Sequence, residues 1–305
     1  KMIITVDLGI TDVDAIKRAS ELGVDVIVTD HHLPNGTLPP AYAILNSKQE
    51  KDTYPDDQLC GAGVAFKLVQ ALLLKGTDIW QIEVKEGWEK WLLDMAGLAT
   101  IADMVPLRNE NRVLAYYGLQ VLRKSRRLGI QKLCRKMKID QRTITEDDVG
   151  FMIAPRINAA SRMDHPMDAF RLLATRDEIE ADKLSDYLNK INDERKGVVG
   201  SMVREIKRRV SSREEVRDVI VVGDPRWRPA LLGLAANSLM EEYSRPVCLW
   251  GREGGDTIKG SCRSDGSVNV VQMMSTTKDI FIDAGGHKFS GGFSVHHEKV
   301  HLLED

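Results

Sequence analysis

Carboxylate and imidazole side chains in the first third of the chain have the types and spacing of a metal site. Asp7 ends one apolar run, an Asp-His-His triplet at residues 30–32 ends the next, and Asp103 ends a third. Carboxylates and neutral imidazoles without cysteine suit a hard or borderline divalent cation such as Mn²⁺ or Mg²⁺. Two such cations about 3.5–4 Å apart cleave phosphodiesters, because one generates hydroxide and the other stabilises the leaving oxygen. The pattern therefore predicts a metal-dependent phosphodiesterase.

Each of these residues also has a structural interpretation that needs no metal. The triplet is compatible with a polar turn after a strand, Asp7 with a helix-capping acid, and Asp103 with a surface acid ahead of a proline. A metal site is favoured if Asp7 and the triplet follow neighbouring parallel strands. Ligands of an open parallel sheet bind outside the carboxyl ends of its strands.

The elements that must hold Asp7 and the triplet form a β-α-β unit. The β-branched residues 3–6 predict a buried strand, a helix follows and stops at Gly23, and residues 24–29 predict a second strand. A strand, a helix and a strand in succession give two parallel strands. Both acid-bearing strand ends are therefore expected at one edge of a sheet. Residues 43–46 predict a third short strand.

Helical segments follow this sheet. Apolar periodicity predicts helices at residues 61–74 and 88–101, with further helices starting near 111 and 130. Residues 178–210 are polar with an apolar stripe, which predicts one long amphipathic helix that connects two domains.

A second, smaller domain is expected after the long helix. Its predicted elements are strands at 219–222, 247–250 and 258–261, a helix at 230–243, a loop at 285–287 and a final strand from 291. A length of 305 residues also exceeds what one hydrophobic core usually supports. We therefore expect an α/β protein with a parallel-sheet domain at 1–176, a connecting helix at 177–212 and a substrate-binding domain at 213–305.

Two later clusters have the composition of phosphate-binding sites. Residues 155–162 place two arginines, an amide and a hydroxyl among small residues, and guanidinium groups match phosphate oxygens. Residues 259–264 and a Gly-Gly-His triplet at 285–287 combine cations with glycines, whose backbone N–H groups can face an anion. A small-residue helix contact and an ordinary glycine turn are the structural alternatives for these two clusters.

The charge of the chain is balanced overall and uneven locally. There are 43 basic and 45 acidic residues, so a nucleic-acid partner must be held by local patches. Residues 121–138 contain eight basic residues and no acid. The simplest interpretation of this basic run is a solvated helix face, and its functional interpretation is a track for a nucleic-acid backbone.

Composition excludes some classes of protein. Apolar residues make up 43% of the chain, which argues against intrinsic disorder. No apolar run is long enough for a membrane span, so no membrane partner is expected. The four cysteines lack metal-ligand spacing, which predicts reduced thiols in a cytoplasmic protein. Because the chain opens directly on a strand-like segment, we expect it to be part of a longer protein.

Several runs taken together resemble the DHH phosphoesterase family, and within it the RecJ-type single-stranded-DNA exonucleases. The runs are TVDLGI at 5–10, TDHH at 29–32, GAGVAFKL at 61–68, ATIADMVPL at 99–107 and PRINAA at 155–160. The Gly-Gly-His triplet at 285–287 is similar to that of the DHHA1 domain, which follows the DHH domain in this family. The resemblance spans residues 3 to about 296.

The resemblance implies a two-metal exonuclease that degrades single-stranded DNA from 5′ to 3′ in DNA repair and recombination. It implies that Asp7 bridges two Mn²⁺ or Mg²⁺ ions and that His31 and Asp103 are ligands of one of them. His32 would contact the scissile phosphate, and Asp30 would orient the site. The implied nucleic-acid and phosphate contacts are Asn158, Ser161, Arg162, Ser261, Arg263, Gly285, Gly286 and His287.

The sequence also departs from the family pattern. The family's first motif, an Asp-x-Asp-Gly run on an earlier strand, is absent, and the similar run at residues 12–15 stands after Asp7 instead of before it. Two alternatives therefore stay open. One is a related hydrolase of short oligoribonucleotides or cyclic dinucleotides, which the runs at 99–107 and 155–160 disfavour. The other is a catalytically weakened nucleic-acid-binding scaffold, which the presence of Asp7, His31 and Asp103 disfavours.

Overall fold

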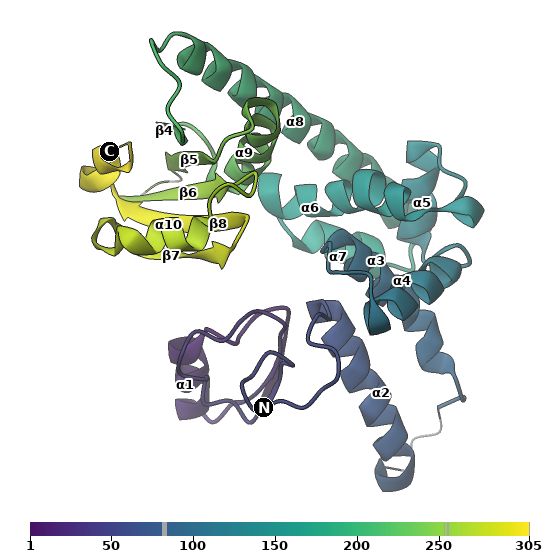
Figure 1. Ribbon diagram of the computed structural model, residues 1–305. Coiled ribbons are helices and arrows are strands. Elements are labelled where there is room, and N and C mark those ends of the chain that lie inside the picture. Colours follow the sequence, from purple (N-terminus) through teal and green to yellow (C-terminus); the bar gives the residue numbers. More distant parts are fainter. Residues whose placement is uncertain (81–83, 253, 255, 305) are drawn as a thin grey trace. The chain divides into compact units, whose positions relative to one another are not determined.

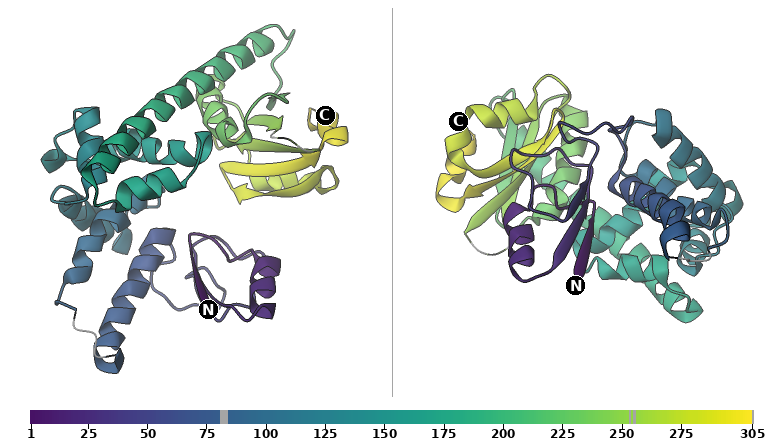
Figure 2. Two further views of the ribbon diagram at one scale, coloured as in Figure 1. Left: turned by 180° about the vertical axis from the view of Figure 1, so that it is seen from behind. Right: turned by 90° about the horizontal axis from the view of Figure 1, so that it is seen from below.

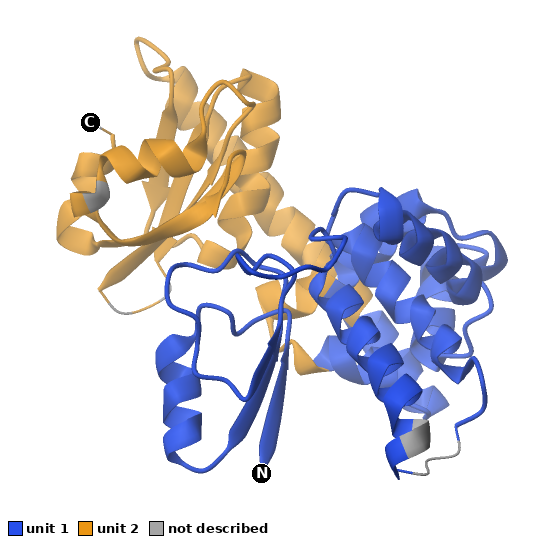
Figure 3. Ribbon diagram, turned by 60° about the horizontal axis from the view of Figure 1, so that its bottom comes forward, with its two compact units in different colours: residues 1–157, 168–187 blue, residues 158–167, 188–305 orange. Residues whose placement is uncertain are grey.

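The computed structural model describes residues 1–80, 84–252, 254 and 256–304. The chain divides into two compact units, shown in Figure 3. Unit 1 comprises residues 1–157 and 168–187, and unit 2 comprises residues 158–167 and 188–305. Helix α8 (Glu178–Ser211), the predicted connecting helix, runs unbroken from one unit into the other (Figure 1).

Unit 1 begins with the predicted parallel sheet. Strands β1 (Met2–Val6), β2 (Asp25–Thr29) and β3 (Ala43–Leu45) stand in the order β1-β2-β3, and both pairings are parallel. Helix α1 (Val13–Glu21) connects β1 to β2 and lies beside the strands (Figure 2). In register, Val6 pairs with Thr29, which in turn pairs with Leu45. The carboxyl ends of the three strands therefore lie at the same edge of the sheet, as the β-α-β pattern predicted for β1 and β2.

The expectation that the first strand is buried is wrong. Ile3 and Ile4 of β1 point to opposite faces, yet they are 47% and 51% exposed. The small core of this layer forms between α1 and β2, where Ile16 packs with Val26 and Val28. Strand β1 lies at the edge of the sheet, outside that core. Local sequence determines the conformation of the strand, whereas packing decides its burial.

A helical layer follows the sheet, and it lies in unit 1 except for residues 158–167, which belong to unit 2. Its elements are α2 (Gly61–Trp80), the 3₁₀ helix η1 (Trp88–Leu92), α3 (Leu93–Ala102), α4 (Asn109–Leu122), α5 (Leu128–Met137), the 3₁₀ helix η2 (Gln141–Thr143), the π-helical turn η3 (Asp148–Ile153), α6 (Ala154–Met163) and α7 (Met167–Ala174). Helices α3 and α4 touch at two glycines. A Cβ atom on Gly97 would lie 2.5 Å from Cα of Gly118, so only glycine permits this approach.

Part of the basic run at 121–138 is paired inside unit 1. The ammonium groups of Lys132 and Lys136 on α5 lie 2.7 Å and 2.8 Å from carboxylate oxygens of Glu178 and Asp186 on α8. Arg127 donates to the buried Asp94 at 2.8 Å. For these residues the structure supports an intramolecular role, in which the run holds α5 against the first turns of α8.

Unit 2 is built on a five-stranded mixed sheet. Its elements after α8 are β4 (Ile220–Asp224), α9 (Pro229–Tyr243), β5 (Val247–Arg252), β6 (Thr257–Arg263), α10 (Val270–Thr276), η4 (Lys278–Ile280), β7 (Phe281–His287), β8 (Ser290–His296) and η5 (His297–Leu303). The strand order is β4-β5-β6-β8-β7, in which only β4 and β5 are parallel. Residues of α8 and α9 form one core cluster against the sheet, and residues of α10 contribute to another.

The Gly-Gly-His triplet does not form the predicted loop. Gly285, Gly286 and His287 are the last residues of β7, which pairs with β8 across a tight turn. A Cβ atom on Gly286 would lie 2.4 Å from the carbonyl oxygen of Ser290, so the glycine allows the two strands to approach. Two adjacent glycines are typical of a turn, but here Gly286 serves strand packing, whereas a Cβ atom on Gly285 would have nothing within 4 Å.

Among the described residues, no helix is both long enough and apolar enough to cross a membrane.

Candidate metal and phosphate sites

The carboxyl ends of β1 and β2 are bound tightly to each other. The Asp7 N–H donates to the Thr29 carbonyl at 2.9 Å, and the Thr29 hydroxyl donates to the Thr5 carbonyl at 2.6 Å. Asp7 then takes a left-handed backbone conformation, with φ of 67°. Such a φ is uncommon for a residue other than glycine and tends to occur at functional sites. It ends the strand and turns the Asp7 side chain towards the next strand end.

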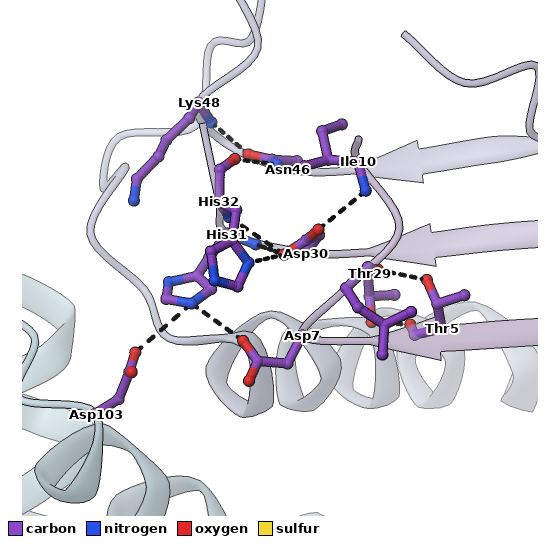
Figure 4. A network of polar contacts seen from close by, with 11 residues as sticks. Thr5, Asp7, Ile10, Thr29, Asp30, His31, His32, Asn46, Lys48 and Asp103 are labelled. Atoms are coloured by element: carbon purple, nitrogen blue, oxygen red, sulfur yellow. Dashed lines mark hydrogen bonds and ion pairs between the residues drawn. The ribbon is translucent and has the colours of Figure 1, made fainter. Parts of the chain in front are cut away.

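The other two predicted metal ligands, Asp7 and Asp103, both lie close to His31. Its Nε2 atom lies 3.0 Å from Oδ1 of Asp7 and 3.6 Å from Oδ2 of Asp103 (Figure 4). Asp103 lies at the C-terminal end of α3, far in sequence from Asp7 and His31. The His31 side chain is 11% exposed, whereas those of Asp7 and Asp103 are 57% and 42% exposed. The structure thus brings these three residues together around a position that solvent can reach.

Asp30 is the buried anchor of the histidine pair. Its carboxylate is 1% exposed and accepts hydrogen bonds from the N–H groups of Ile10, His31 and His32. The Nδ1 atom of His32 lies 2.7 Å from Oδ1 of Asp30. Burial opposes ionisation of Asp30, but these hydrogen bonds outweigh it and lower the pKa of the carboxyl. Asp30 therefore stays charged and fixes the backbone and one ring of the triplet.

His32 faces solvent more than its neighbour. Its side chain is 52% exposed, and its carbonyl accepts a hydrogen bond of 2.8 Å from the Asn46 side chain. The His31 and His32 rings meet edge to face, with centroids 4.6 Å apart. Because Asp30 engages Nδ1 of His32, the Nε2 atom is the one left to contact a ligand.

The start of helix α2 lies directly against Asp7. A Cβ atom on Gly61 would lie 2.5 Å from the Asp7 Oδ1 atom, so only glycine fits. The first residue of α2 is Gly61, and the amino end of a helix favours a nearby negative charge. Gly61 supports the site without being a ligand. The sequence marked it only as part of the GAGVAFKL run.

The pKa values at this site reflect crowded charges. The hydrogen bond to Asp7, with the nearby charge of Asp103, raises the pKa of His31. Burial, together with the negative charge of Asp7, raises the pKa of Asp103. A cation bound here would relieve the repulsion between the two carboxylates around the imidazole. Lys48 was not predicted as a site residue, yet its positive charge partly offsets both increases in pKa and therefore acts close to the site.

The donor set fits a divalent cation. Two carboxylates and an imidazole converge, and His32 can join Asp7 and His31, since one ligand atom of each lies within 4.8 Å of the others. Oxygen and imidazole donors suit Mn²⁺ and Mg²⁺. The Nδ1 atom of His31 is buried and has no hydrogen-bond partner among the described residues. The ring is therefore oriented by packing and by what its Nε2 atom contacts.

A second cluster of predicted residues meets inside unit 2. Arg263 on β6 donates to the hydroxyl of Ser261 at 3.0 Å, and Arg162 on α6 donates to the Ala230 carbonyl at 2.9 Å. Burial lowers the pKa of both arginines, and the charge of Arg162 lowers that of Arg263 further. Neither arginine is in an ion pair with a described residue. Two partly buried guanidinium groups without a carboxylate are suited to binding a phosphate.

Helix α9 allows this cluster to form. A Cβ atom on Gly233 would lie 2.6 Å from Nη2 of Arg263 and 3.1 Å from Oγ of Ser261. Gly233 was not predicted from the sequence, because one glycine in a helix gives no local signal of a distant partner.

The other predicted phosphate contacts stand around this cluster or outside it. Across the sheet, Arg263, Ser290 and His287 stand in one row, so His287 is two strands, or about 10 Å, from Arg263. Gly285 and Gly286 are exposed residues of β7. Asn158 and Ser161 lie on α6, where the Ser161 hydroxyl donates to the Asn158 carbonyl. Arg162, Ser261 and Arg263 form a compact group.

Known proteins share this order of domains. The DHH family, N-terminal domain, matches residues 1–101, and the DHHA1 domain matches residues 216–304. A crystal structure of exonuclease RecJ bound to manganese is 32% identical in sequence and superimposes with a TM-score of 0.77, covering 99% of this chain and 73% of that chain. This chain belongs to the RecJ family. The resemblance inferred from the sequence runs is thereby confirmed.

RecJ proteins from several bacteria are similar over nearly the whole chain. RecJ of Bacillus subtilis is 39% identical over 98% of this chain and 37% of its own length, and RecJ of Escherichia coli is 32% identical over 100% and 55%. RecJ from Thermus thermophilus in complex with Mn²⁺ is 31% identical, with a TM-score of 0.85, over 99% and 43%. That protein has also been solved with Mg²⁺. The chain thus spans about half the length, or less, of these curated relatives.

Proposed function

We propose that this chain is the nuclease core of a RecJ exonuclease, which hydrolyses single-stranded DNA from its 5′ end in cytoplasmic DNA repair. The observation that supports this most directly is the convergence of Asp7 and Asp103 on Nε2 of His31. The relatives named above are called single-stranded-DNA-specific exonucleases. Four free cysteines fit a reducing compartment.

In this proposal, Asp7, His31 and Asp103 would hold Mn²⁺ or Mg²⁺. The bound cations would supply a hydroxide nucleophile at neutral pH and stabilise the charge on the leaving oxygen. Asp30 holds His32 by its Nδ1 atom, so that Nε2 can donate to an oxygen of the scissile phosphate. Arg162, Ser261 and Arg263 bind a phosphate of the substrate strand.

Metal binding and strand hydrolysis test the assignment together. Purified protein is titrated with Mn²⁺, and hydrolysis of a 5′-phosphorylated single strand is followed with and without Mn²⁺. We expect His31→Ala and Asp103→Ala to lose hydrolysis and to weaken Mn²⁺ binding, with the fold retained by circular dichroism. Asp25→Ala is the matched control, because Asp25 is an exposed acid at the opposite end of β2. Retained cleavage in either ligand variant would refute the assignment.

The choice of substrate separates this proposal from its alternatives. A RecJ core should degrade a long 5′-phosphorylated single DNA strand in preference to a dinucleotide. A preference for dinucleotides would instead indicate a small-molecule phosphodiesterase. Binding of single strands without hydrolysis of either substrate, at saturating Mn²⁺, would indicate a nucleic-acid-binding scaffold.

A further inference from the structure

A hollow of about 860 Å³ lies in unit 1, away from the proposed metal ligands. It forms where the segment ahead of α3, the loop before α5 and the end of α7 come together. Asp94 near the start of α3 lines it, whereas Asp103 follows the opposite end of the same helix. At 1.5 Å per residue, the ten residues of α3 separate the two ends by roughly 15 Å. The hollow is therefore distinct from the metal site.

Two tryptophans form one wall of this hollow. Trp88 and Trp91 stand three residues apart on the 3₁₀ helix η1, which has about three residues per turn, so they share one face. They are 49% and 52% exposed. Paired exposed indole rings of this size usually mark a binding surface, since their flat faces offer stacking area at small entropic cost.

Three arginines line the same hollow, namely Arg126, Arg127 and Arg176. Arg127 is neutralised by Asp94, to which it donates at 2.8 Å. Arg126 and Arg176 are exposed, and neither is in an ion pair with any described residue. This differs from Lys132 and Lys136 of the same basic run, which the acids of α8 neutralise. The hollow therefore combines free cations with exposed aromatic rings.

We propose that this hollow is an accessory binding site for single-stranded nucleic acid, with bases stacked on Trp88 and Trp91 and phosphates held by Arg126 and Arg176. Stacking rings beside unpaired cations are the two features that bind single strands without sequence preference. An apolar protein partner would cover the rings but would leave the two guanidinium groups without counter-ions. The inference rests on the proposed function only in that a nucleic acid is the substrate.

The test is a binding measurement on the full chain in EDTA, so that no strand is hydrolysed. The probe is a fluorescently labelled oligothymidylate, and salt concentration is varied. We expect Trp88→Ala with Trp91→Ala to weaken binding by roughly 30-fold or more, the effect of losing two stacked bases. We expect Arg126→Ala with Arg176→Ala to reduce the slope of log affinity against log salt by about 1.4, the value for two phosphate contacts.

Matched controls come from the same unit. Tyr116 and Tyr117 on α4 are an exposed aromatic pair, 58% and 52% exposed, that does not line the hollow. Arg142 is an exposed arginine already paired with Asp140. Tyr116→Ala with Tyr117→Ala, and separately Arg142→Ala, should change neither affinity nor salt slope. Trp88→Phe with Trp91→Phe should retain most of the affinity, which guards against a folding defect in the alanine variant.

The outcomes separate this inference from the proposed function. If the alanine variants at the tryptophans and arginines bind oligothymidylate as the unaltered chain does, while Arg263→Ala weakens binding, the accessory site is refuted and the proposed function stands. If the unaltered chain binds no single strand at all, both fail. If the tryptophan variant alters self-association instead of oligothymidylate binding, the hollow is a protein interface and the inference is overturned.

Discussion

Gly61 and Asp7 are in such close contact that any side chain at position 61 would overlap the Asp7 carboxylate. The first residue of α2 thereby presses on the residue that ends β1 in a left-handed conformation. Asp7, a proposed metal ligand, is held by steric fit as well as by its hydrogen bond to Thr29.

Gly61→Ala should therefore damage the metal site without removing a ligand. A Cβ at this position would lie 2.5 Å from Oδ1 of Asp7 and must displace it. Misplaced ligands typically cost roughly 10- to 100-fold in metal affinity, as measured for residues that orient ligands. The measurement is Mn²⁺ titration calorimetry. The control is Gly197→Ala in α8, where nothing lies within 4 Å of the added atom. Unchanged Mn²⁺ affinity in Gly61→Ala would show that Asp7 is not a ligand.

Arg263→Ala should weaken binding of single-stranded DNA and make it less dependent on salt. Arg263 is partly buried, close to Arg162 and without an ion-pair partner among the described residues, so a phosphate is its expected counter-ion. Loss of one phosphate contact should reduce the salt slope by about 0.7 for a single strand. Arg245→Ala serves as a control, because Arg245 donates to the Val216 and Arg217 carbonyls. A salt slope equal to that of the unaltered chain would argue against a phosphate contact at Arg263.

Lys48→Met should also lower affinity for the substrate strand. The positive charge of Lys48 partly offsets the raised pKa values of His31 and Asp103, so it acts near the expected position of the scissile phosphate. Methionine keeps the length of the side chain and removes its charge. We expect weaker binding with a shallower salt slope in fluorescence anisotropy, whereas Lys51→Met should be neutral. Tighter binding in Lys48→Met would contradict a contact with phosphate.

Unit 2 should lose stability in acid through Asp224. This carboxyl is 7% exposed and accepts hydrogen bonds from Arg226 and Arg209, and the bond from Arg226 contributes most to lowering its pKa. Because the folded-state pKa lies below the unfolded value near 3.9, this stabilisation is present above about pH 4. It is lost as the pH falls towards the folded-state pKa. Asp224→Asn should cost about 1.5–3 kcal/mol at pH 6, the usual value for hydrogen bonds to a charged group.

Urea unfolding of the full chain at pH 6 and at pH 3 checks this linkage. The free-energy difference between Asp224→Asn and the unaltered chain should shrink at pH 3, where the stabilisation by the native carboxylate is already partly lost. Asp218→Asn is the control, since Asp218 is fully exposed and should have little effect at either pH. A difference that stays constant between the two pH values would mean that the Asp224 charge does not stabilise the fold.

The sequence by itself determined the β-α-β unit and the level ends of its strands. Alternation of β-branched and helix-forming runs is a local property, and the handedness of parallel crossovers then places Asp7 and the triplet at one edge. It also determined the long helix α8 and the family, because several ordered runs can be recognised without knowing how they pack. The predictions that β1 is buried and that the Gly-Gly-His triplet forms a loop were wrong. Both features depend on neighbours that are distant in sequence.

Only the tertiary structure decided which residues complete the sites. Asp103 reaches His31 from the end of α3, and α3 packs against α4 where Gly97 meets Gly118, which are contacts between residues that no local pattern connects. The same holds for Gly61 against Asp7 and for Gly233 against Arg263, where one missing Cβ atom permits the approach. Local propensity selects elements, whereas the positions of side chains from different elements follow from close packing, in which a shift of one methyl group matters.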